Sequence, residues 1–126
     1  EFRVPHIQHV PIEPHVAIAQ ADLSGKITLW ASSQSPFAQR NLIAKALHIS
    51  QGDLRVIAPY IGGGFGSKAG VSMEACAVVM ALKVQGRAVK LRLTREEEFF
   101  TTFVRQGLVA RTKVGAKKDG KLVAAG

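Results

Sequence analysis

The stretch GGGFG at residues 62–66 constrains this chain more than any other feature. It places four of the twelve glycines within five residues. Glycine loses more conformational freedom on folding than any other residue, so it is favoured where the backbone needs a positive φ or a close approach. The stretch follows a predicted strand at 54–60 and precedes a predicted helix at 71–84. Two hypotheses fit: a tight turn that only links these elements, or a loop whose main chain lies against a ligand.

The spacing of apolar residues predicts an α+β fold with a mixed β-sheet and two main helices, in the order β-β-α-β-α-β-(short α)-β-β. The proline-rich residues 1–14 are expected to form an irregular lead-in. Ser35 is a predicted N-cap, with Pro36 in the first helical position. The expected elements are strands at 15–22, 26–32, 54–60 and 88–94, helices at 37–47 and 71–84, a short helix after Thr94, and two strands within 107–126 joined at Asp119–Gly120.

The length of the chain and the sequence at its two ends indicate its domain organisation. A chain of 126 residues predicts a single domain, residues 1–126, with a core of its own. It does not begin with Met, and its last residues lie within a predicted strand, so we expect a domain excised from a larger protein. The single Cys76 lies in an apolar helical stretch and is expected to be buried.

The formal net charge of +8 raises the question of a nucleic-acid partner. The lysines and arginines are spread along the chain, and aromatic residues do not alternate with them as a base-stacking surface requires. This pattern argues against nucleic acid and favours a solvated basic face or an acidic protein partner. There is also no apolar stretch long enough to span a membrane.

Known phosphate-binding motifs do not match the glycine stretch. A P-loop needs Ser or Thr after its lysine, and Lys68 is followed by Ala69. The dinucleotide fingerprint GxGxxG needs a third glycine where Ser67 stands. Gln34 precedes a helix in a short polar loop. Such a side chain usually hydrogen-bonds the loop backbone, and the alternative is an amide that donates to a ligand oxygen.

The remaining polar side chains give weaker signals. His6 and His9 are three residues apart, but no cluster of carboxylates or cysteines completes a metal site. These two, with His15 and His48, are therefore expected on the surface. The acidic run 96–98 is expected to begin a helix and to meet solvent or Arg105.

Four segments, taken together, resemble a known family in order and spacing. They are IEPHVAIAQ, WASSQSPFAQRNLIAKAL, PYIGGGFGSK and ACAVVMALKVQGRAVKLRLTREEEF. The chain resembles the molybdenum-binding subunit of the xanthine dehydrogenase and aldehyde oxidase family over nearly its whole length. The combination of the glutamine loop with GGGFG is specific, whereas neither is specific alone.

The resemblance implies an oxidoreductase that hydroxylates the carbon of an aldehyde or N-heterocycle, a small-molecule substrate, with oxygen from water. It implies a molybdopterin cofactor, in the cytosine dinucleotide form, and electron transfer to 2Fe–2S clusters and FAD on partner domains or subunits. By the same resemblance, the remainder of the molybdenum subunit is a partner and the location is cytoplasmic.

The resemblance also implies roles for particular residues. Gln34 would hydrogen-bond an oxo ligand of molybdenum, and Gly63, Gly64, Phe65 and Gly66 would lie against the cofactor, with no direct metal ligand in this chain. The family's catalytic base, a glutamate, would lie outside it. We therefore expect the 126 residues alone to bind no cofactor and to be inactive.

Two departures qualify the resemblance. Many members read GGGFGGK, with glycine where this chain has Ser67, and purine-oxidising members carry glutamate where it has Ala69. Purine oxidation is therefore disfavoured. The alternative function is a non-catalytic basic module that binds RNA or an acidic protein.

Overall fold

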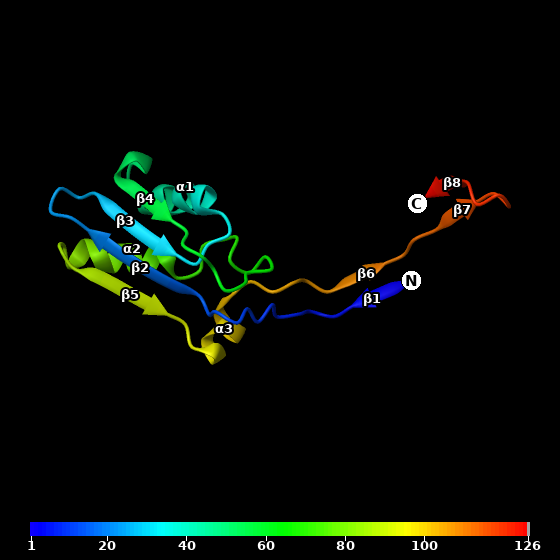
Figure 1. Ribbon diagram of the computed structural model, residues 1–126, viewed down its shortest axis with the longest axis horizontal. Coiled ribbons are helices and arrows are strands. Elements are labelled where there is room, and N and C mark those ends of the chain that lie inside the picture. Colours follow the sequence, from blue (N-terminus) through cyan, green and yellow to red (C-terminus); the bar gives the residue numbers. More distant parts are fainter. Residues whose placement is uncertain (126) are drawn as a thin grey trace. The chain divides into compact units, whose positions relative to one another are not determined.

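The computed structural model describes residues 1–125 (Figure 1). The folded chain divides into two compact units. Residues 8–103 form the larger unit, and residues 1–7 together with the chain from Val104 onward form the smaller one. No helix among the described residues is long and apolar enough to cross a membrane.

The larger unit is built on a mixed sheet, as predicted, and this sheet has four strands. Its strands are β2 (Val16–Ala21), β3 (Ile27–Ala31), β4 (Leu54–Ile57) and β5 (Ala88–Arg92), in the order β4-β3-β2-β5. β2 is antiparallel to both β3 and β5, whereas β3 is parallel to β4. The parallel pair is connected through a helix, because two parallel neighbours need a crossover rather than a tight turn.

The two main helices are α1 (Pro36–Leu47) and α2 (Glu74–Lys83), and a short 3₁₀ turn, η1 (Gln51–Asp53), precedes β4. α1 begins at Pro36 as predicted, but the Ser35 side chain makes no capping bond. The short helix α3 (Arg95–Thr101) begins with a capping box formed by Thr94 and Glu97, which confirms the predicted start.

The core lies between the sheet and the two main helices. Alternate residues of β2 and β3 are buried, as the two-residue period of a strand requires. β2 contributes three alanines, so the backbone of α2 can lie close across it. The buried residues of the apolar core cluster are Ala17, Ala19, Ala21, Ile27, Leu29, Ala31, Ile43, Leu54, Met73, Ala77, Val78 and Ala81. The expectation of a buried Cys76 is wrong, because its side chain lies on the outer side of α2 and is exposed.

The smaller unit consists of two strand pairs. β1 (Phe2–Val4) pairs antiparallel with β6 (Leu108–Ala110), and β7 (Val114–Ala116) pairs antiparallel with β8 (Leu122–Ala125). The predicted hairpin at Asp119–Gly120 is confirmed, and Gly120 has the positive φ of +86° that this turn needs.

Two details of the smaller unit correct the sequence analysis. The lead-in 1–14 is not irregular throughout, because Phe2–Val4 forms a strand whose partner lies more than a hundred residues further along the chain. The stretch predicted as one strand after 107 is instead two strands, β6 and β7, which pair with different partners.

Candidate cofactor site

The topology of the larger unit brings four segments together at one end of the sheet. β3, β4 and β5 all run opposite to β2, so their carboxyl ends meet where β2 begins. The glutamine loop follows β3, the glycine loop follows β4, α3 follows β5, and His15 immediately precedes β2. Loops at the carboxyl ends of strands are a common place for ligand sites in sheets with parallel strands.

The carboxamide of Gln34 lies against the glycine loop, and its orientation is fixed. Its Oε1 accepts the N–H of Gly66 at 2.9 Å and the N–H of Lys68 at 3.3 Å. Its own backbone N–H donates to the Lys68 carbonyl at 2.9 Å. Since Oε1 is held by two donors, Nε2 must point the other way, and no partner for it is found among residues 1–125. Gln34 therefore hydrogen-bonds the loop backbone and keeps an amide donor available.

Gly64 is required for this contact. A Cβ at Gly64 would lie 2.5 Å from Oε1 of Gln34 and 2.6 Å from its Cδ. Real Cβ atoms do not approach other heavy atoms so closely, so any larger residue would displace the carboxamide. At Gly62 a Cβ would lie 2.6 Å from the Cβ of Glu13. Two of the three adjacent glycines are thus explained by close approach.

The tip of the loop is a tight turn at Gly64–Ser67, closed by the Ser67 N–H on the Gly64 carbonyl at 2.9 Å. Both central residues have positive φ, +53° at Phe65 and +105° at Gly66. A non-glycine residue in this region costs about 1–2 kcal/mol. The Phe65 side chain is 72% exposed, so burial in this chain does not offset the cost. Such an outlier directs attention to function.

Ser67, the departure from the family pattern, is buried and stabilises the turn. Its Oγ donates to the Gly64 carbonyl at 2.9 Å, beside the backbone bond to the same oxygen. On the helix side of the loop, the buried Gln39 donates from Nε2 to the Gly70 carbonyl at 3.0 Å. The loop is therefore held along its length by side chains rather than left free.

A buried ion pair ties the loop to the segment before β2. The Lys68 side chain is 0% exposed, and its Nζ lies 2.8 Å from both Oε2 and the carbonyl of Glu13. The same Oε2 accepts the Gly62 N–H at 2.9 Å. Partial burial of the Glu13 carboxyl opposes ionisation. Hydrogen bonds from Lys68 and Gly62 outweigh that effect and lower the pKa of Glu13 below its ordinary value.

His15 and Glu98 form a second buried pair, which corrects two expectations. Both side chains are 1% exposed, and Nδ1 of His15 lies 2.8 Å from Oε1 of Glu98. The His15 backbone N–H also donates to this oxygen. His15 is therefore not a surface histidine, and Glu98 does not meet solvent or Arg105. No local sequence pattern signals the pair, because its members lie 83 residues apart.

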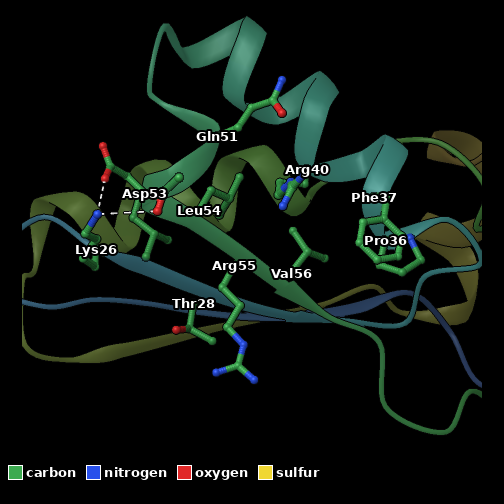
Figure 2. Close-up of a pocket in the computed structure, with 12 residues that line it drawn as sticks. Lys26, Thr28, Pro36, Phe37, Arg40, Gln51, Asp53, Leu54, Arg55 and Val56 are labelled. Carbon is green, nitrogen blue, oxygen red and sulfur yellow. Dashed lines mark hydrogen bonds and ion pairs between the residues drawn. The ribbon is translucent and has the colours of Figure 1, made fainter.

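A separate pocket lies between α1 and β4 and contains none of these loop residues (Figure 2). Lys26 forms an ion pair with Asp53 at one end of it, with Nζ 2.6 Å from Oδ1. At the other end the guanidinium of Arg40 lies over the Phe37 ring, 5.9 Å from its centroid. The pocket is thus distinct from the candidate site.

The structure brings together all the site residues named from the sequence: Gln34, Gly63, Gly64, Phe65 and Gly66. The sequence analysis missed their supports, which are His15, Glu98, Glu13, Lys68 and Gln39. Among residues 1–125 no group of three or more His, Cys, Asp or Glu side chains could hold a metal ion. The site offers an amide donor, backbone close to the surface and an exposed aromatic ring. This donor set fits an organic group with acceptor oxygens.

Comparisons with known proteins agree with this geometry. The sequence model of the molybdopterin cofactor-binding domain matches residues 1–126. The xanthine dehydrogenase molybdenum-binding subunit of Escherichia coli is 35% identical over 96% of this chain and 16% of its own length. The aldehyde oxidoreductase molybdenum-binding subunit of the same species is 34% identical over 98% of this chain and 17% of its own.

Solved structures of molybdenum enzymes also match this chain. The aldehyde oxidoreductase of Desulfovibrio gigas superposes with a TM-score of 0.83 at 32% identity, over 98% of this chain and 14% of that one. The fold and the sequence thus define a cofactor-binding domain of molybdenum oxidoreductases. The chain belongs to the molybdopterin cofactor-binding domain family, as found in molybdenum-binding subunits of the xanthine dehydrogenase and aldehyde oxidase type. It spans about a sixth of the length of the curated relatives it matches.

Proposed function

We propose that this chain forms one wall of the molybdopterin pocket in a molybdenum hydroxylase. The proposed reaction is hydroxylation of an aldehyde or N-heterocycle carbon with oxygen from water. The observation that carries the proposal is the orientation of Gln34, whose Oε1 is held by the loop while Nε2 stays available as a donor. A carboxamide fixed in this way can bind an acceptor oxygen of the cofactor without first reorganising.

The residues of this chain would hold and orient the cofactor rather than react. Gln34 would donate to it, the peptide groups of 63–66 would lie against it, and the Phe65 ring would cover it and exclude water. When bound, the molybdenum–pterin group supplies the two-electron redox chemistry. A base to activate water would come from outside these 126 residues, so the chain alone would be inactive.

The proposal extends to the rest of the protein. The pterin would be in the cytosine dinucleotide form, and the electrons would pass to 2Fe–2S clusters and FAD on partner domains or subunits in the cytoplasm. Relatives that are named as molybdenum-binding subunits support this separation of the molybdenum site from the other redox centres. No specific observation favours the alternative of a non-catalytic module for RNA or an acidic protein.

The test is the molybdenum and pterin content of the full-length protein that contains this chain. Wild type should carry about one molybdenum per subunit and oxidise an aldehyde or an N-heterocycle from a substrate panel. Gly64→Ala should lose most of the metal, because the new methyl group would displace Gln34. Gly52→Ala is the matched control, since a Cβ there would meet only Ser50 Oγ at 3.5 Å.

Two results would contradict the proposal. One is a wild-type protein without molybdenum that binds RNA in a salt-dependent way. The other is Gly64→Ala with full metal content and unchanged activity.

A further inference from the structure

The buried His15 contacts the glycine loop through a single peptide group. Its Nε2 lies 3.2 Å from the Ser67 carbonyl oxygen. The same peptide group contributes the Lys68 N–H, which donates to Oε1 of Gln34 at 3.3 Å. One side of this peptide therefore faces His15, and the other side faces the carboxamide that we propose to orient the cofactor.

The partners of His15 determine which ring nitrogen donates to the loop. Nδ1 faces the Glu98 carboxyl group, and Nε2 faces the Ser67 carbonyl oxygen. A carbonyl oxygen can only accept, so the proton of that contact is carried by Nε2. On the other side of the ring, one further proton is shared between Nδ1 and Oε1 of Glu98. His15 is thus held by Glu98 on one side and donates from Nε2 to the loop on the other.

These contacts form a continuous chain of hydrogen bonds. It runs from Glu98 to His15, through the Ser67–Lys68 peptide group, and on to Gln34. An Nε2–H that donates to the carbonyl polarises the peptide and strengthens its N–H as a donor. Gly66 supplies the second donor to Oε1, so the chain acts on one of two bonds that orient Gln34.

We propose that His15, held by Glu98, is a positioning residue that sets the orientation of Gln34 through the Ser67–Lys68 peptide group. Its side chain is 1% exposed, so it would act through this peptide group and not by direct contact. The inference rests on the proposed function only where it concerns the cofactor. Its effect on the loop holds for the cofactor-free protein as well, so the two can fail separately.

The first test measures hydrogen–deuterium exchange of the loop in the full-length, cofactor-free protein. His15→Gln should raise amide exchange in 62–70 about tenfold, because the Nε2–H hydrogen bond to the Ser67 carbonyl is lost. Glu98→Gln keeps an acceptor oxygen but removes the carboxyl group that holds His15, and it should give a smaller increase. His6→Gln is the control, since His6 is exposed and lies in the other unit. Unchanged exchange in both buried variants would overturn the inference.

The second test uses the molybdenum(V) electron paramagnetic resonance signal of the loaded protein. His15→Gln should change the shape of the signal from the metal that remains bound, and it should do so much less in a Gln34→Ala background. A purely structural role would lower metal content and leave the signal shape unchanged, which would overturn the inference.

Glu98→Gln is measured in the same way, so that the inference does not depend on the folding of one variant. If His15→Gln does not fold, the signal shape and loop exchange of Glu98→Gln decide between the two outcomes. Wild-type protein without molybdenum, but with the predicted exchange differences, would contradict the proposed function and support the role of His15.

Discussion

At the scale of single residues, the two ends of one carboxamide determine the site. The oxygen of Gln34 accepts two loop N–H groups, so the nitrogen is presented on the opposite side. Free rotation would otherwise make donor and acceptor interchangeable. The neighbouring Gly64 makes this possible by leaving space that any β-carbon would fill.

Phe65 gives the first prediction. Its φ of +53° is strained, and its ring is mostly exposed. Phe65→Gly should therefore raise the free energy of unfolding by about 1 kcal/mol, because glycine adopts positive φ without that cost. The same change should lower molybdenum content, since it removes the ring. Urea unfolding measures the change in the free energy of unfolding, and metal analysis measures the molybdenum content. Phe65→Leu keeps the strain and should not gain stability, and a loss of stability in Phe65→Gly would contradict the strain at this residue.

At the scale of elements, the pair of Glu13 and Lys68 makes the loop sensitive to acid. The folded-state pKa of Glu13 lies below its ordinary value of 4.5. Ionised Glu13 therefore stabilises the fold above that pH, and the contribution is lost as the pH falls through the folded-state pKa.

The second prediction follows from this sign. Glu13→Gln should be less stable than wild type at pH 7. The difference should shrink below about pH 4.5 and disappear once Glu13 is protonated in the folded state. Thermal unfolding from pH 7 to pH 3 measures it, with the exposed Glu96→Gln as control. A difference that stays constant over this range would contradict the role of the ion pair.

The third prediction concerns the start of α3. Thr94 Oγ1 accepts the Glu97 N–H at 3.2 Å, and Glu97 Oε2 accepts the Thr94 N–H at 2.7 Å. Thr94→Ala should lower the free energy of unfolding by about 1 kcal/mol. Since α3 carries Glu98, the change should also raise amide exchange at Ser67 and Lys68. Thr101→Ala, at the other end of the helix, should have little effect on either. Equal effects of the two variants would show that the cap is not involved.

Sequence patterns predicted the helices, strands and turns better than the contacts between them. The helix start after Thr94, the proline start of α1 and the Asp119–Gly120 turn depend on neighbouring residues, so they could be predicted. The pairing of Phe2–Val4 with β6 could not be, because nothing near residue 2 specifies a partner at 108–110. The burial of Glu98 was missed for the same reason. Acidic residues in the first turn of a helix give the same sequence pattern whether or not a histidine packs against them.

At the scale of the whole molecule, the site belongs to one unit. The buried apolar core and every residue named for the site lie within residues 8–103. The other unit consists of strand pairs, and most side chains of its described residues, 1–7 and 104–125, are exposed.

The fourth prediction is that residues 8–103 fold without the rest. This shortened chain should unfold cooperatively in urea, with a midpoint close to that of residues 1–126, because it keeps the whole apolar core. Circular dichroism and tryptophan fluorescence measure the transition. Removing residues 99–103 as well should lower the free energy of unfolding further, because Gly70 packs against the Phe103 ring. A chain of 8–103 without a cooperative transition would contradict the division into two units.

The candidate site was predictable in part at this scale. The resemblance to a family supplied Gln34 and the glycines, and the order of strands explains why they meet. The local sequence could not supply the supports, because Glu13 lies in the lead-in that was expected to be irregular and His15 was expected on the surface. Their partners, Lys68, Ser67 and Glu98, are 52 to 83 residues away.

The enclosure of Lys68 has a practical consequence. Its amine is wholly shielded from water, whereas Lys45 and Lys90 are exposed. Acetic anhydride should modify those two readily and spare Lys68 in the native protein. Trypsin should likewise cut after Lys68 only once the fold has opened. The degree of acetylation at this one lysine would thus report how often the glycine loop opens. The measurement needs no metal, pterin or catalytic activity.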